Sequence, residues 1–82
     1  MNNKNKMTVE IFGETYALKG DMDVEYVKKL ANMVDQQMRL IAKSNHRLPV
    51  AKIAVLAALN ISNDYIKLEE DYKQMIDMFK DD

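Results

Sequence analysis

Few residues of this chain have the types and the spacing that catalysis or metal binding requires. The nearest match to a nucleophile and its base is Ser44 with His46, which share an expected turn without a strong orienting group. Three acids, Asp21, Asp23 and Glu25, stand close together, but the ligand spacing and the glycine of a calcium loop are missing. We interpret these acids as helix-capping residues and predict a protein that is not an enzyme and binds no cofactor.

The composition argues against a metal site and in favour of self-association. The 82 residues include no Cys and one His, so one chain cannot build a thiolate site or an imidazole cluster. A chain of this length buries a modest core, and small domains without disulfides or metals are usually stabilised by oligomerisation. No apolar run approaches the roughly 20 residues of a membrane helix, so we expect a single soluble domain that self-associates.

Charge is distributed unevenly along the chain. The first 35 residues are nearly balanced, the segment 36–63 carries a net charge of +4, and the segment 64–82 has three Lys against seven acids. Such a basic segment inside an acidic chain is suited to an acidic protein partner. The simpler interpretation is a solvated loop, and nucleic-acid binding is disfavoured because no aromatic residues interleave with the basic ones. The four cations, named here the basic elbow, are Arg39, Lys43, Arg47 and Lys52.

Residues 6–18 have the pattern of a β-hairpin. Apolar and polar residues alternate on both sides of Gly13-Glu14, a pair that suits a two-residue type II′ turn. A lone hairpin is marginal in water, so its apolar face must rest on helices. The predicted register places four apolar side chains on that face, with Val9 opposite Leu18 and Ile11 opposite Tyr16.

A first helix is predicted after the hairpin, ending near residues 43–45. Asp21 and Asp23 are both suitable N-caps, and Ser44-Asn45 are poor helix residues at the expected end. Between these limits, apolar residues recur every three or four positions, which indicates one buried helical face. These residues are Val27, Leu30, Val34, Met38 and Ile41.

A second helix is predicted from about Pro49 to about Lys80, and it would be about 45 Å long. Its first part, 50–61, is apolar nearly all round and should be buried on most sides. The later part has a heptad stripe, which predicts a coiled coil with a second copy. The alternative is a helix that folds back on its own domain. The stripe, named here the seam, consists of Ala54, Ala58, Ile61, Tyr65, Leu68, Tyr72, Met75 and Phe79.

The sequence thus predicts an α+β homodimer in which a β-hairpin packs on two helices. We expect a disordered segment over 1–6, a head with the start of the long helix over 7–61, and a coiled-coil tail over 62–82. Small seam residues near the head favour close approach of the two helices there. The flanking charges do not specify a parallel or an antiparallel pair, because Asp64 would face the like-charged Glu69 in a parallel one.

Several short motifs resemble the ZapA family of cell-division proteins. The matching residues are Ile11-Phe12-Gly13, Tyr26, Leu30-Ala31, Val34-Asp35 and, most specifically, Ala57-Ala58-Leu59-Asn60-Ile61. The similarity extends from about Thr8 to Leu68, and it departs from some members at Glu14, where they have a basic residue.

The resemblance implies a cytoplasmic bacterial protein at the mid-cell division ring. Its partner would be the tubulin-like protein FtsZ, whose protofilaments it would cross-link and bundle as a dimer that can assemble further into tetramers. Some members have a longer coiled coil, so the resemblance leaves the tetramer open for this chain. We expect no nucleic-acid or membrane partner. A small dimeric nucleic-acid-binding or regulatory protein that uses the basic elbow is the alternative, and a passive oligomerisation module is another.

Overall fold

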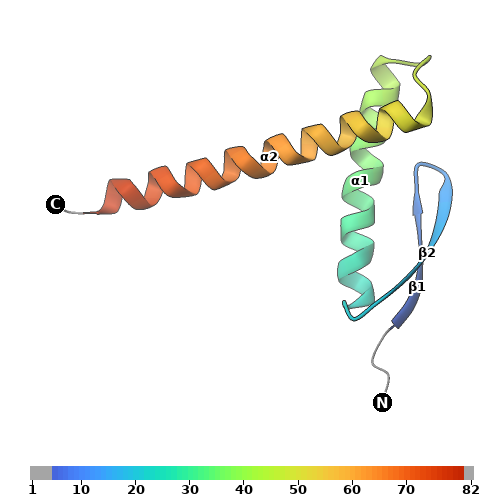
Figure 1. Cartoon of the computed structure of the whole chain (residues 1–82), viewed down its shortest axis with the longest axis horizontal. Coiled ribbons are helices and arrows are strands. Elements are labelled where there is room, and N and C mark those ends of the chain that lie inside the picture. Colours follow the sequence, from blue (N-terminus) through green and yellow to red (C-terminus); the bar gives the residue numbers. More distant parts are fainter. Residues whose placement is uncertain (1–4, 81–82) are drawn as a thin grey trace.

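The structure, a computed structural model, describes residues 5–80 and consists of a hairpin followed by two helices (Figure 1). The strands are β1 (Asn5–Ile11) and β2 (Glu14–Gly20), and the helices are α1 (Val24–Ser44) and α2 (Val50–Phe79). The predicted α+β fold is therefore confirmed. β1 takes in Asn5 and Lys6, two residues of the segment that was expected to be disordered, while residues 1–4 and 81–82 lie outside the described part of the chain.

The hairpin forms, but its predicted turn and register are wrong. The two turn residues are Phe12 and Gly13, with φ angles of 51° and 80°, so both have the positive φ of a type I′ turn. Val9 consequently pairs with Tyr16, and Met7 pairs with Leu18. A shift of two residues leaves the same side chains on the same face, because side chains alternate with a period of two.

A contact from outside the hairpin explains this choice of turn. The backbone N–H of Phe12 donates a hydrogen bond of 2.7 Å to the Asp35 carboxylate on α1. Phe12 itself packs against the buried residues where the two helices cross. Judged by residue type alone, Gly13 is suited to the first position of a type II′ turn. The two contacts of Phe12 instead hold its backbone in the left-handed region, which costs conformational energy for a residue other than Gly. Tertiary structure therefore decides the register.

Helix α1 begins and ends where its capping residues predict. The Asp23 carboxylate accepts a hydrogen bond of 3.2 Å from the Tyr26 N–H. At the other end, the Asn45 N–H donates a hydrogen bond of 3.0 Å to the Ile41 carbonyl. One face of the helix covers β1. The first buried cluster of the head joins these two elements and consists of Met7, Val9, Val27 and Ala31.

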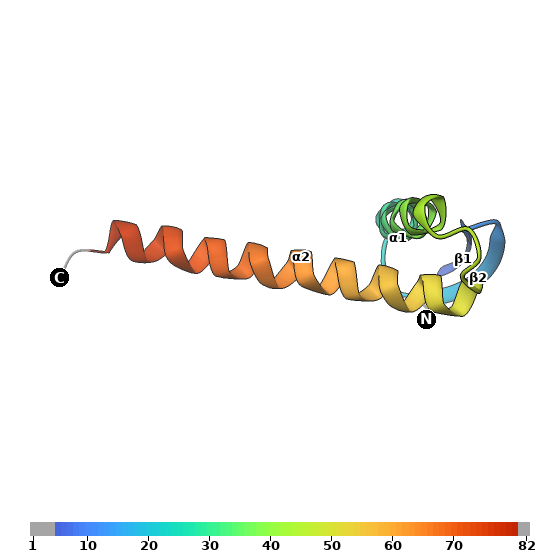
Figure 2. The ribbon, with the colours of Figure 1, turned by 90° about the horizontal axis from the view of Figure 1, so that it is seen from above.

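Helix α2 starts after Pro49, crosses α1 near the C-terminal end of that helix, and then runs away from the head (Figure 1). Seen along α1, the hairpin and the start of α2 both lie on one side of this helix (Figure 2). The second buried cluster is the crossing itself, where Met38 of α1 meets Ile53 and Ala57 of α2. The alternative in which the tail folds back onto its own head is therefore wrong.

The expectation that residues 50–61 are buried on most sides is not met within one chain. Ile53 and Ala57, which face α1, are 3% and 1% exposed, whereas Val55 and Leu59 are both 60% exposed. The hairpin is covered on one half only, because α1 packs on β1 and leaves Tyr16 and Leu18 of β2 exposed. The head therefore presents apolar surface that its own chain does not cover.

Candidate functional site

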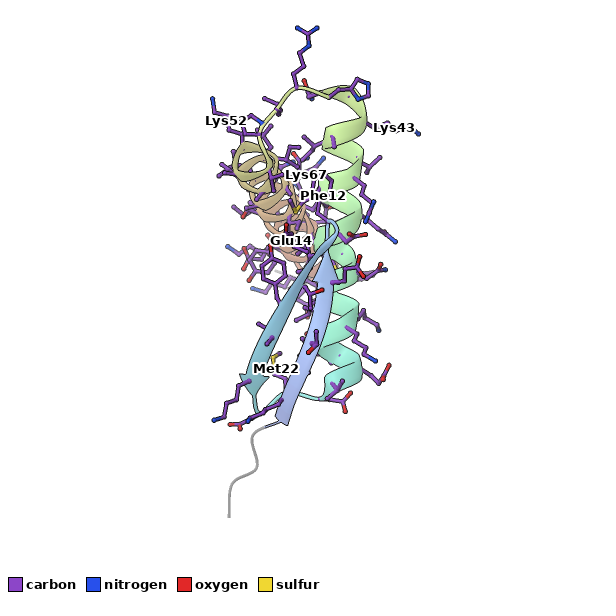
Figure 3. The ribbon with its side chains drawn as sticks, turned by 90° about the vertical axis from the view of Figure 1, so that its right-hand side faces the viewer. Phe12, Glu14, Met22, Lys43, Lys52 and Lys67 are labelled. Atoms are coloured by element: carbon purple, nitrogen blue, oxygen red, sulfur yellow. The ribbon has the colours of Figure 1, made fainter. Side chains whose placement is uncertain are left out.

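The basic elbow lies around the connection between the two helices. Arg39 and Lys43 are one helical turn apart on α1, Arg47 lies in the connection, and Lys52 lies near the start of α2. All four are exposed. Lys43 and Lys52 project to opposite sides of the head (Figure 3). The structure thus separates Lys52 from Lys43, so the elbow is not a single flat patch.

Arg39 and Lys43 share a shallow surface depression on α1. The depression, of about 400 Å³, is lined by Gln36, Arg39, Leu40 and Lys43. Cations spaced four residues apart lie on one side of a helix, and here they flank an exposed leucine. This basic face thus combines two positive charges with some exposed apolar area.

Arg39 also belongs to a small polar cluster at the tip of the hairpin. Its Nε donates a hydrogen bond of 2.9 Å to the Asp35 carboxylate, and its guanidinium lies 5.8 Å from the centre of the Phe12 ring. The hydrogen bond from Arg39, followed by that from the Phe12 N–H, lowers the pKa of Asp35 below its ordinary value. The same contact raises the pKa of Arg39, which stays charged. The cluster fixes the hairpin tip beside the basic face.

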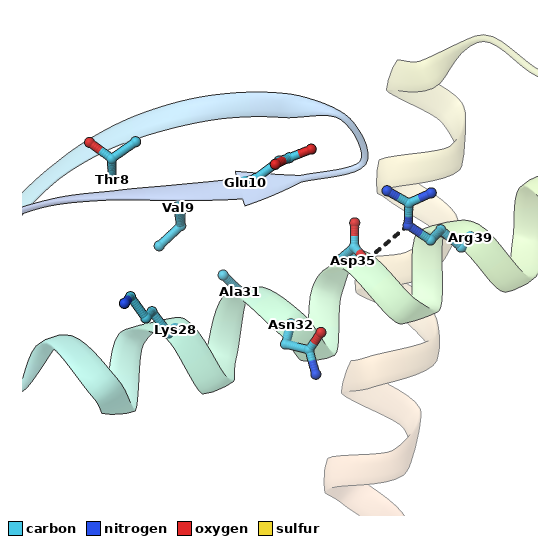
Figure 4. A pocket seen from close by; sticks show the side chains of 8 residues that line it. All are labelled: Thr8, Val9, Glu10, Lys28, Ala31, Asn32, Asp35 and Arg39. Carbon is cyan, nitrogen blue, oxygen red and sulfur yellow. Dashed lines mark hydrogen bonds and ion pairs between the residues drawn. The ribbon is translucent and has the colours of Figure 1, made fainter.

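A polar groove of about 450 Å³ runs between β1 and α1 beside this cluster (Figure 4). Its charged side chains have opposite signs and come from both elements. Its lining residues are Thr8, Val9, Glu10, Lys28, Ala31, Asn32, Asp35 and Arg39.

Sequence reasoning did not predict that Phe12 and Asp35 lie against Arg39 of the basic elbow. The signal for the ion pair was present, because Asp35 and Arg39 are four residues apart on a predicted helix, a spacing that favours contact. The contact between Asp35 and the Phe12 backbone had no such signal, since it spans 23 residues of the chain.

The seam faces solvent along the whole tail. Tyr65, Leu68 and Tyr72 are 63%, 69% and 62% exposed, and Phe79 is 81% exposed. Ala54 and Ala58 are exposed as well, and Ile61 is half-buried. A single helix in water is marginal without a packed face, and monomeric proteins rarely expose a contiguous apolar stripe of this length. The seam is therefore the second candidate interaction surface of the molecule.

Residues 5–80 were also considered as a metal site and as a membrane-spanning segment, and they have the features of neither. In this part of the chain, no group of three or more His, Cys, Asp or Glu side chains is placed to hold a metal ion. Neither described helix is long and apolar enough to cross a membrane.

Comparison with known proteins places the chain in a family. The family model of the cell division protein ZapA matches residues 7–81. The cell division protein ZapA of Geobacillus sp. strain WCH70 is 40% identical over 73 residues, which cover 89% of this chain and 84% of that protein. The cell division protein ZapA of Bacillus pumilus strain SAFR-032 is 40% identical over 72 residues, 88% of this chain and 85% of that protein.

Solved structures agree with these relatives. A ZapA mutant dimer from Geobacillus stearothermophilus superposes with a TM-score of 0.72 at 30% identity, over 99% of this chain and 94% of that chain. An unknown conserved bacterial protein from Pseudomonas aeruginosa PAO1 gives a TM-score of 0.76 at 27% identity, over 90% of this chain and 82% of that chain. Because the family model and the relatives cover almost its whole length, the chain belongs to the ZapA family of cell division proteins.

Proposed function

We propose that two copies of this chain pair through the seam and that the resulting homodimer binds FtsZ, cross-links its protofilaments and stabilises the division ring. The protein would act in the cytoplasm at mid-cell and catalyse no reaction. The observation that carries this proposal is the exposed seam on a helix that leaves the head, with Leu68 69% and Phe79 81% exposed. Membership of a family of cell division proteins and a dimeric structural relative support it.

Bivalency supplies the mechanism. A homodimer carries two identical heads, and each head presents one site for the filament partner. Two weak sites on one body hold two filaments with an avidity that neither site has alone. The long helix α2, of 30 residues, is continuous from the head into the tail and would fix the two sites relative to each other. Cross-linking therefore requires the pair, whereas binding requires one head.

For the docking surface we propose the part of the basic elbow formed by Arg39, Lys43 and Arg47. Arg39 and Lys43 lie beside an exposed leucine in the depression on α1, which combines charge with apolar contact. An acidic partner would be steered to these cations, so added salt should weaken bundling. Lys52 projects to the opposite side from Lys43 and falls outside the proposed surface (Figure 3).

The test is sedimentation with polymerised FtsZ. The double variant Lys43→Glu/Arg47→Glu should lose co-sedimentation while light scattering still gives the mass of a dimer. Lys52→Glu is a control, because it reverses one charge on the other side of the head and should co-sediment like the wild type, whereas Lys43→Glu alone, with the same change in net charge, should weaken co-sedimentation. Normal co-sedimentation by the double variant would rule out this docking surface. Binding of a generic DNA duplex at moderate salt, without co-sedimentation, would instead favour the nucleic-acid alternative.

A further inference from the structure

The outer edge of β1 has no partner strand in the part of the chain that the structure describes. The sheet there has two strands, and β1 pairs with β2 along one side. The polar groove of about 450 Å³ is lined by residues of β1 and α1 and by none of β2, so it follows this outer edge (Figure 4). The edge of the hairpin is therefore open to a further strand above α1.

The pairing with β2 decides which backbone groups of β1 point outward. The two-residue turn makes Ile11 and Glu14 a hydrogen-bonded pair, and such pairs alternate with non-hydrogen-bonded pairs along an antiparallel ladder. Thr8 and Glu10 belong to the non-hydrogen-bonded pairs, so they direct their N–H and C=O groups away from β2. Both residues line the groove. The groove is therefore bordered by two sets of backbone donors and acceptors.

Phe12 is the next residue in the same outward row. Its N–H already donates a hydrogen bond of 2.7 Å to the Asp35 carboxylate, which closes the row at the turn end. The outward groups of Thr8 and Glu10 have no corresponding bond to the described residues. They repeat every two residues, or about 7 Å, which is also the repeat of any other extended backbone. An extended peptide is therefore the ligand that these groups fit.

The α1 wall of the groove carries charge at both ends. Asp35 and Arg39 stand at the turn end and offset each other through their hydrogen bond of 2.9 Å. Lys28 stands at the other end (Figure 4). Its ammonium makes a contact of 3.7 Å with the carboxylate of Glu25, whose side chain is 81% exposed, and such surface pairs contribute little in water. Lys28 therefore remains available to an acidic ligand.

This edge lies apart from the apolar surfaces of the molecule. The exposed Tyr16 and Leu18 belong to β2, on the other side of the hairpin, and the seam belongs to α2. Along β1 itself the exposed side chains are polar, namely Lys6, Thr8 and Glu10. Polar and charged side chains on an edge strand disfavour pairing with apolar strands. The edge is therefore suited to a polar segment whose charge matches the groove.

We propose that the outer edge of β1 is a docking site for an extended acidic segment of another protein, which adds to the hairpin as a third strand. The backbone of the segment pairs with Thr8 and Glu10, and a carboxylate of the segment meets Lys28. Main-chain hydrogen bonds supply affinity in complexes of this kind, and the side-chain contacts supply specificity. The site does not depend on the proposed binding of FtsZ, and its test alters neither Lys43 nor Arg47.

An NMR titration of the isotope-labelled full chain tests the site. The probe is a capped seven-residue peptide of Thr and Val with one central Glu, a composition that favours an extended strand. We expect saturable shifts of the Thr8 and Glu10 amide signals, and slower hydrogen exchange of both amides once the peptide is bound. The same peptide with N-methylated backbone amides should not bind. Gln in place of the central Glu should weaken binding about threefold, the size of one exposed ion pair.

Charge reversal in the groove provides a matched pair of protein variants. Lys28→Glu should weaken binding of the Glu peptide and should bind a peptide with a central Lys more tightly than the wild type does. Lys29→Glu makes the same change in net charge one position outside the groove, and it should bind both peptides like the wild type. Thr8→Pro removes an outward N–H that the hairpin does not use, and Pro is tolerated at such edge positions, so this variant should lose binding.

Circular dichroism and light scattering first establish that each variant keeps the wild-type fold and mass, and the comparison of Lys28→Glu with Lys29→Glu decides the matter if Thr8→Pro does not fold. Absence of saturable shifts at Thr8 and Glu10 in the wild type would overturn the docking site. Equal binding by the two charge variants would overturn the acidic ligand. Slow exchange of both amides in the free protein would show that a second copy already occupies the edge, which would also overturn the proposal. None of these outcomes bears on co-sedimentation with FtsZ.

Discussion

Apolar side chains are buried in the head of this molecule but exposed along its tail. In the head, α1 covers β1 and crosses α2, so Val9, Met38 and Ile53 are buried within one chain. In the tail, the seam has a comparable density of large apolar residues, and all of them from Tyr65 onward are exposed. This sequence therefore encodes an apolar surface that the chain buries by itself and another that stays exposed in one chain, which we propose to be covered by a second copy.

The largest expected effect comes from a charge placed in the seam. Leu68→Asp would put two like charges into the proposed interface, at a cost of about 3–5 kcal/mol in dimer stability. The light-scattering mass should fall to that of one chain, and the melting temperature should lose its dependence on concentration. Lys67→Asp, one position away and off the seam, is the control. A variant with wild-type mass and melting temperature would contradict the heptad interpretation.

A cavity in the head should destabilise the protein by the same amount at every protein concentration. Ile53→Ala removes a side chain that is 3% exposed at the crossing of the helices, so we expect a loss of about 2–5 kcal/mol in the free energy of unfolding. Urea denaturation at several protein concentrations measures it. Because the contact lies within one chain, the loss should be the same at each concentration. A loss confined to low concentration would mean that Ile53 serves the dimer instead.

A substitution in the hairpin turn should cause a smaller loss of stability, and this loss should be confined to the head. Gly13→Ala puts a Cβ on a residue with φ of 80°, where nothing else lies within 4 Å, so only the backbone conformation opposes it. We expect a destabilisation of about 1–2 kcal/mol. Gly20→Ala is a matched control, since Gly20 has equally open surroundings and lacks the positive φ. Equal melting temperatures for the two variants would refute the type I′ assignment.

The smallest expected effect is the pH dependence of the stability that Asp35 contributes. The pKa of Asp35 in the folded chain lies below its ordinary value of 3.8, because Arg39 and the Phe12 N–H stabilise the carboxylate. Its contribution to stability is therefore present above pH 3.8 and is lost as the pH falls through the lower folded value. Asp35→Asn should melt below the wild type at neutral pH, and the difference should shrink in acid. A difference that grows in acid would reverse the assigned sign.

Local signals in the sequence were sufficient for the elements and for the approximate ends of the helices. Alternation predicted the hairpin, Asp21 and Asp23 were the two candidate caps at the start of α1, of which Asp23 is the one used, and heptad spacing predicted the apolar stripe of the tail. These features depend on neighbours within a few residues, which a sequence displays directly.

The features that sequence missed depend on distant contacts. The register of the hairpin is set by Asp35, 23 residues away, and the opposite directions of Lys43 and Lys52 follow from the angle at which two helices cross. The basic elbow is contiguous in sequence but divided in space for the same reason. The expected burial of residues 50–61 on most sides is not met within one chain, because composition does not show which sides of a helix its own chain covers, and Val55 and Leu59 are both 60% exposed.

Bivalent cross-linking by a homodimer is tested most directly by a light-scattering mass across a dilution series, followed on the same sample by sedimentation with polymerised FtsZ. We expect at least twice the 9.5 kDa of one chain at every concentration where FtsZ co-sediments and bundles. A stable monomer, even one that co-sediments, would contradict the account, because a single head cannot join two filaments.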